Sequence, residues 1–68
     1  MNAEKPEVDI EVSDLGSIFL FYPNTEIARL HLEKHCLDAL WFGGALCCEH
    51  RYALYLAANL QRAGFTVE

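Results

Sequence analysis

The sequence predicts an α+β fold, a small two-layer α/β sandwich of about three to four strands with two helices on one face. Three observations predict it: an alternating segment near the N-terminus, two segments of helical periodicity, and a continuous apolar stretch between those two. Short strand–helix–strand connections favour right-handed crossovers, so we expect the order β-β-α-β-α-β. A flexible tail over 1–6 is expected to precede a single domain over 7–68.

Two strands are expected at the start of the domain. Residues 7–12 alternate between carboxylate and β-branched side chains, which is the period of a half-buried strand. A turn at 13–16 leads into the apolar run 17–22, which can complete a hairpin. The acidic side of the first strand spaces its carboxylates roughly 6.6–7 Å apart, and these are Glu7, Asp9 and Glu11. Such a face is ordinarily solvated, but its spacing can also imitate nucleic acid in a basic groove.

The first helix is expected after a proline that ends the second strand. Asn24 is the predicted cap, and Glu26 lies favourably near the positive end of the helix dipole. The helix should reach about Leu37, with Arg29 and Glu33 on the same side as Glu26. Its flank toward the core carries Ile27, Ala28, His31, Leu32, His35 and Cys36.

The remaining residues predict a third strand and a second helix. The stretch from Ala39 to Cys48 is apolar and is interpreted as one strand, in which Gly43-Gly44 permits a bulge or a close backbone approach. The helix should begin near Glu49 and end at a left-handed Gly64. Residues 65–68 alternate and can form a short last strand. The core stripe of this helix is Tyr52, Ala53, Leu56, Ala57, Leu60 and Ala63.

The composition predicts association with another macromolecule. The chain has 68 residues and an apolar content of 53%, above the roughly 45–50% that is typical of soluble domains. A domain this small buries a low fraction of its surface. We therefore expect a homodimer or an obligate protein partner.

The expected interface has two parts, the outer side of the second helix and the region that runs from the third strand to the start of that helix. Its residues are Trp41, Arg51, Tyr52, Leu54, Tyr55 and Ala58. The alternative for Glu49-His50-Arg51-Tyr52 is a capped, solvated helix start.

Charge and cysteine usage limit the partner type and the compartment. The net charge is −5, and only five residues are lysine or arginine, so direct nucleic-acid binding is unlikely. The three cysteines include the adjacent pair Cys47 and Cys48, which cannot bridge each other without strain, so reduced thiols are expected. The sequence has neither a signal-peptide pattern nor a membrane-spanning apolar run, so we expect a cytoplasmic protein.

Two kinds of reactive site are alternatives to a binding function. His31 and His35 are separated by four positions on one helix, a spacing that can hold zinc, with Cys36 as a third donor. The alternative is that these residues bind no metal and are packed or partly exposed side chains. Cys36 points about 100° away from His35, and no C-x-x-C pair is present. A thiol site would use Cys47 or Cys48 with His50 as base and Glu49 as its orienter, but adjacent residues at a bend point in different directions. We expect no cofactor and no catalytic residue.

The junction between the third strand and the second helix carries a resemblance. Residues 39–46 (Ala-Leu-Trp-Phe-Gly-Gly-Ala-Leu), followed by Glu49-His50-Arg51-Tyr52 and Ala63-Gly64-Phe65, resemble small uncharacterised proteins encoded by phages, plasmids and integrative elements of proteobacteria. The match covers about the C-terminal half, with a weaker echo in Ala28-Arg29. The resemblance implies an accessory protein of a mobile element and no particular activity. The two adjacent cysteines and the histidine pair depart from the apolar or neutral residues usual there.

The preferred functional hypothesis is a non-enzymatic, cytoplasmic protein-binding module, homodimeric and of mobile-element type. Within that hypothesis, an acidic mobile-element protein is a candidate inhibitor of a host defence or nucleic-acid-processing complex. The competing hypothesis is a small zinc- or thiol-dependent enzyme that uses His31, His35, Cys47 and Cys48.

Overall fold

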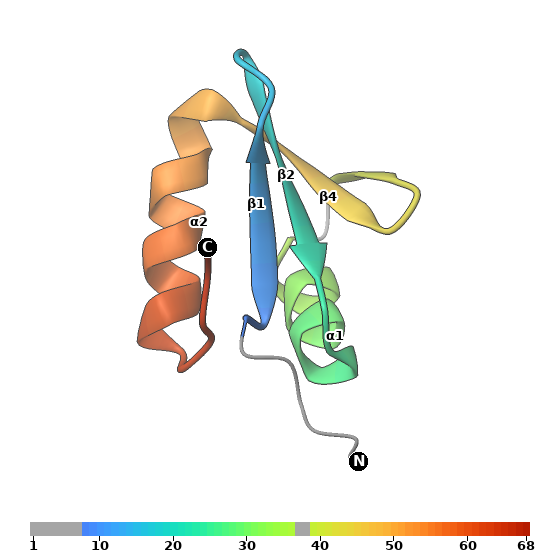
Figure 1. Ribbon diagram of the computed structural model, residues 1–68, viewed down its shortest axis with the longest axis vertical. Helices are drawn as coiled ribbons and strands as arrows, with labels where there is room; N and C mark the ends of the chain where they lie inside the picture. The colour runs from blue at the N-terminus through green and yellow to red at the C-terminus, as the bar shows by residue number, and fades with distance from the viewer. Residues whose placement is uncertain (1–7, 37–38) are drawn as a thin grey trace.

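Four strands form one antiparallel sheet in the computed structural model, which describes residues 8–36 and 39–68. The elements are β1 (Ile10–Asp14), β2 (Ile18–Pro23), α1 (Glu26–His35), β3 (Leu40–Phe42), β4 (Ala45–Glu49) and α2 (His50–Arg62). The strand order is β1-β2-β4-β3, and each neighbouring pair is antiparallel. The predicted α+β class is therefore confirmed, with the observed order β-β-α-β-β-α (Figure 1). The predicted tail over 1–6 lies outside the described residues.

Both helices pack on the same face of the sheet. The residues of the core alternate along each strand with those of the opposite face, as the strand period requires. The fully or almost fully buried cluster takes three residues from the sheet, two from α1 and two from α2, and these are Ile10, Phe21, Leu46, Ala28, Leu32, Ala53 and Leu60. Among the described residues, no helix is long and apolar enough to cross a bilayer.

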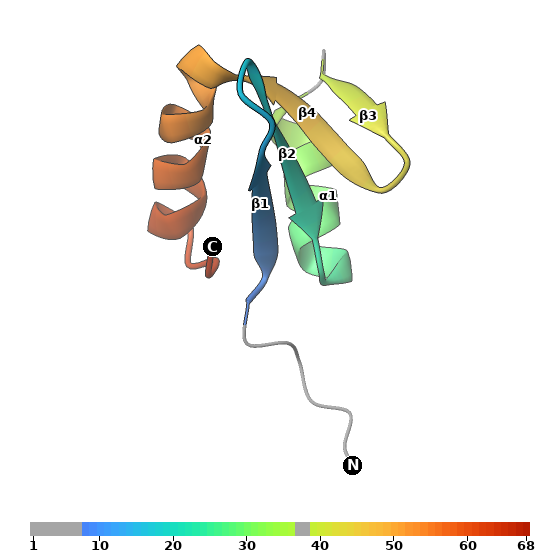
Figure 2. The same cartoon turned by 45° about the horizontal axis from the view of Figure 1, so that its top comes forward.

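The apolar stretch from Ala39 to Cys48 is a hairpin, so the prediction of one continuous strand is wrong. Phe42 pairs directly with Ala45, which leaves Gly43 and Gly44 as a two-residue loop. Gly43 has φ +57°, a conformation that glycine adopts without steric cost and that tight hairpin loops require. Figure 2 shows this hairpin projecting on the side of the sheet away from α2.

The start of α1 is capped by Thr25, so the prediction of Asn24 as the cap is wrong. The backbone N–H of Ala28 donates to Thr25 Oγ1 at 3.0 Å. Asn24 is used differently, because its side-chain Nδ2 donates to the Val8 carbonyl oxygen at 2.9 Å and thereby ties α1 to the start of β1. Ile27 was expected on the core flank but is 71% exposed, since it lies about 100° around the helix from the buried Ala28.

The last residues of the chain extend the sheet beyond β1. Val67 forms a parallel bridge with Ile10, and Ile10 N donates to Thr66 O at 3.0 Å while Glu68 N donates to Ile10 O at 3.0 Å. The predicted last strand is therefore one bridge with its flanking hydrogen bonds. It follows α2 directly, because Gly64 has φ +103° and Phe65 N donates to Leu60 O, which ends the helix as predicted.

Candidate functional site

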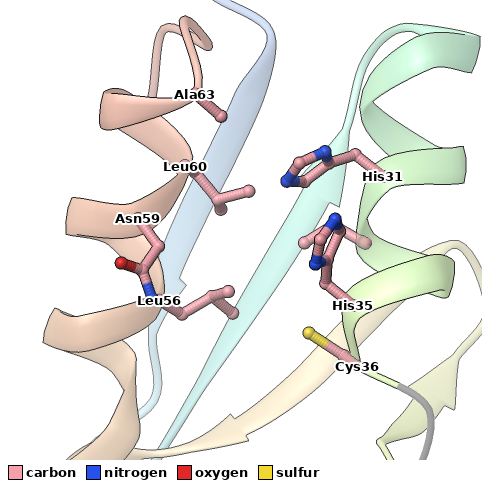
Figure 3. Close-up of a pocket in the computed structure, with 8 residues that line it drawn as sticks. His31, His35, Cys36, Leu56, Asn59, Leu60 and Ala63 are labelled. Carbon is pink, nitrogen blue, oxygen red and sulfur yellow. The ribbon is translucent and has the colours of Figure 1, made fainter.

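A cleft of about 370 Å³ lies between the two helices. Four of the residues that line it come from α1 and its cap and four come from the second half of α2 and its cap: His31, Leu32, His35, Cys36, Leu56, Asn59, Leu60 and Ala63. Figure 3 shows His31, His35 and Cys36 on one side of the cleft facing Leu56, Leu60 and Ala63 on the other, with strands of the sheet behind them. Helical periodicity placed both histidines on the flank toward the core, and the structure brings them to this cleft.

The two histidines of the cleft contact each other. The ring centroids of His31 and His35 are 4.3 Å apart, and the ring centroids of His31 and Phe65 are 4.9 Å apart. Burial lowers the pKa of His31, and the nearby positive charges of His35 and Lys34 lower it further. The α2 wall supplies apolar side chains and Asn59, none of which titrates. His31 is therefore held as a neutral imidazole at neutral pH.

This neutral imidazole makes stability depend on pH. The unfolded chain binds a proton at His31 more readily than the folded chain does, so stability falls as pH drops below the ordinary histidine pKa of 6.5. We expect the urea midpoint of the natural protein to decrease between pH 7.5 and 5, and the decrease to be smaller in His31→Gln. Equal decreases in both proteins would contradict the assigned environment of His31.

The cleft supplies only part of the ligand set that the metal-binding alternative requires. His31, His35 and Cys36 all line the cleft, but within residues 8–36 and 39–68 no group of three or more histidine, cysteine or acidic side chains is arranged to hold a metal ion. A structural zinc site takes four protein ligands. The histidine pair alone supplies at most two.

The thiols lie in apolar surroundings. Burial raises the pKa values of Cys36 and Cys48, and for Cys48 the neighbouring Cys36, Cys47 and Glu49 raise it further. An activated cysteine has a lowered pKa, so these shifts are in the opposite direction. The proposed base, His50, instead places its ring against Phe19 at a centroid distance of 5.2 Å. In the described part of the chain no hydrogen bond joins His50 to a thiol.

The predicted interface residues divide into two groups. Trp41 pairs with Leu46 and packs against the core, so it lies on the helix-covered face and does not join the others. The other five, from α2, are all exposed, and Leu54 and Tyr55 are 74% and 71% exposed. Tyr52 is exposed as well, so its prediction as part of the core stripe is wrong. We call the side of α2 that points away from the sheet the outer stripe, which consists of Leu54, Tyr55 and Ala58 with Arg51 and Arg62 at its ends.

The sequence analysis missed a second apolar surface on the side of the sheet that the helices leave uncovered. We call this surface the open face. The register arranges it in three rows across the strands: Glu11, Tyr22, Ala45 and Phe42; then Ser13, Leu20, Cys47 and Leu40; then Ile18 and Glu49. Leu40, Phe42 and Tyr22 are 68%, 57% and 41% exposed, whereas Leu20 and Ala45 on the same face are buried. Reading Gly43-Gly44 as a hairpin loop would have placed Leu40 and Phe42 on the face opposite Leu46 and indicated this surface.

The described residues of the predicted acidic face, Asp9 and Glu11, take part in local hydrogen bonds. Asp9 Oδ2 accepts from the Thr66 N–H at 2.9 Å, and Glu11 Oε2 accepts from Asn24 Nδ2 at 3.3 Å. Glu7 lies outside the described residues. Both described carboxylates therefore have a role in joining the ends of the sheet, whatever they contact beyond the chain.

Comparison of this chain with protein-family models, with curated proteins and with solved structures gives no match in any of the three.

Proposed function

We propose that this protein is a non-enzymatic protein-binding module that associates with a second copy of itself. The observation that supports the proposal is the large apolar area that the fold leaves uncovered, on the open face and on the outer stripe of α2. Monomeric proteins rarely expose contiguous apolar patches larger than a few hundred Å², and larger patches commonly mark sites of association. The exposed large hydrophobic side chains are Leu15, Tyr22, Ile27, Leu30, Leu40, Phe42, Tyr52, Leu54 and Tyr55.

The place of such a module in the cell follows from the resemblance to mobile-element proteins. We propose a cytoplasmic accessory protein of that type, with inhibition of a host defence or nucleic-acid-processing complex as its role. The net charge of −5 supports a basic protein surface as a further target and disfavours direct binding of nucleic acid.

The competing candidate is supported by the cleft between the helices, whose wall carries His31, His35 and Cys36. Its lining suits a small ligand and offers two histidines to a metal ion, and a metal- or thiol-dependent reaction is the second proposal. Two measurements separate it from the first: elemental analysis of the purified protein and titration of the native thiols. One equivalent of zinc, or one unusually fast thiol, would favour the enzyme.

The double variant Leu54→Glu/Tyr55→Ser tests the binding proposal. We expect the natural protein to have a mass above that of one chain in multi-angle light scattering, and the variant to be monomeric, because the outer stripe gains a charge and loses its aromatic anchor. Far-UV circular dichroism checks that the variant is folded.

A matched double variant on α1 is the control. Ile27→Glu/Leu30→Ser changes two exposed apolar residues in the same way on the other helix and should leave the mass unaltered. A monomeric natural protein, or an unaltered mass in the α2 variant, would contradict the use of this stripe in association.

A further inference from the structure

The outer stripe of α2 is positively charged. Helix α2 contains no aspartate or glutamate, and Arg51 and Arg62 lie on the same side of the helix as Ala58. In the described part of the chain the only ion pairs are those of Arg29 with Glu26 and Glu33, so neither α2 arginine is paired there. At 1.5 Å per residue, the two arginines lie about 16 Å apart along the helix axis. The stripe is thus an apolar surface with a positive charge at each end.

The open face has the opposite charge pattern. Within the three rows its charged side chains, Glu11 and Glu49, lie at opposite corners, opposite Tyr22 and Ile18 respectively on β2, and Glu68 adds a negative charge beside Glu11. Two strand spacings and four residue steps separate the Cα positions of these residues, which gives a diagonal of about 16 Å. The buried Leu20 lies at the middle of that diagonal, and the exposed apolar side chains beside it are Tyr22, Leu40 and Phe42. The open face is thus an apolar surface with a negative charge at each end of one diagonal.

We propose that the outer stripe of one copy binds the open face of a second copy, so that the chains associate head to tail. The two surfaces match in apolar character, in the sign of their end charges and in the spacing of those charges. The α2 helix of the same chain cannot make this contact, because it packs on the other face of the sheet. The inference rests on the self-association proposed above and specifies which surfaces meet. A contact of this kind is heterologous and leaves one free surface of each type on a pair of copies.

A mixing experiment tests the arrangement. The helix variant, Leu54→Glu/Tyr55→Ser, retains the open face, and a sheet variant, Tyr22→Ser/Leu40→Ser, retains the outer stripe. Each variant alone should have the mass of one chain, 7.7 kDa for the natural sequence, in sedimentation velocity. An equimolar mixture should contain a species of twice that mass, because one intact stripe and one intact open face are then available.

Other results would overturn the inference in identifiable ways. A helix variant that still dimerises alone would indicate a symmetric contact between open faces, and a sheet variant that still dimerises alone would indicate a symmetric contact between stripes. Two monomeric variants that do not associate on mixing would also overturn it, while the self-association in the proposed function would stand. A monomeric natural protein would overturn both proposals.

Charge reversal gives an independent test that leaves the apolar side chains in place. Arg51→Glu/Arg62→Glu and Glu11→Lys/Glu49→Lys should each weaken association, and mixing the two reversed chains should restore association, because each stripe then meets an open face of opposite charge. Association of the natural protein should weaken several-fold between 50 and 500 mM NaCl, because the end charges are screened. Association that is insensitive to salt and to both reversals would overturn the head-to-tail arrangement.

Discussion

Leu32→Ala should lower the free energy of unfolding by about 2–5 kcal/mol and leave much of the chain unfolded at 25 °C. Leu32 is fully buried in the cluster that joins α1 to the sheet, so its truncation removes apolar burial and leaves a cavity. A domain of this size has a stability of only a few kcal/mol, so a loss of that order removes most of it. Urea denaturation followed by far-UV circular dichroism measures the change.

Leu30→Ala is the matched control for this substitution. Leu30 lies on the same helix, is half exposed, and undergoes the same chemical change. Its replacement should alter the free energy of unfolding by about 0.5 kcal/mol or less. Similar losses in the two variants would mean that α1 does not pack on the sheet through Ala28 and Leu32.

Gly43→Ala should lower the free energy of unfolding by about 1–2 kcal/mol, because an L-residue with a side chain adopts the left-handed backbone conformation only at that cost. Gly43 has φ +57°, and no heavy atom lies within 4 Å of the position its Cβ would occupy. The loss would therefore come from the backbone and not from a steric contact with the rest of the protein. Thermal and urea unfolding both report it.

Its neighbour in the same two-residue loop provides the comparison. Gly44 also has open space around its Cβ position but has no positive φ. Gly44→Ala should be neutral or slightly stabilising, since alanine restricts the unfolded chain. If the two substitutions cost the same, the assigned loop conformation is wrong.

Local patterns predicted most elements of the fold but not all of their boundaries. Alternation over 7–12 indicated the first strand, yet β1 runs from Ile10 to Asp14, because its extent is set by pairing from Ile10–Pro23 to Asp14–Phe19. The helical period and Gly64 predicted α2 to within one residue of its start at His50. The cap of α1 was missed because Asn24 and Thr25 are both good capping residues, and the contact of Asn24 with Val8 decides between them.

The open face was not predicted because a two-residue loop changes the relation between sequence parity and sheet face. In one continuous strand, Phe42 and Leu46 would share a face. In the hairpin Phe42 pairs with Ala45 and Trp41 pairs with Leu46, so Phe42 lies on the open face while Leu46 lies in the core. The outer stripe of α2 depends only on the helical period, and the sequence alone was sufficient to indicate it.

The bridge between Val67 and Ile10 has a consequence for biosynthesis. The sheet gains its outermost hydrogen bonds only when residues 66–68 reach β1, which is synthesised earlier. While those residues are still inside the ribosomal exit tunnel, β1 has an unpaired edge and the C-terminal end of α2 has no anchor. We therefore expect this domain to complete its folding only after Glu68 has left the ribosome, at a rate set by contacts between distant parts of the chain.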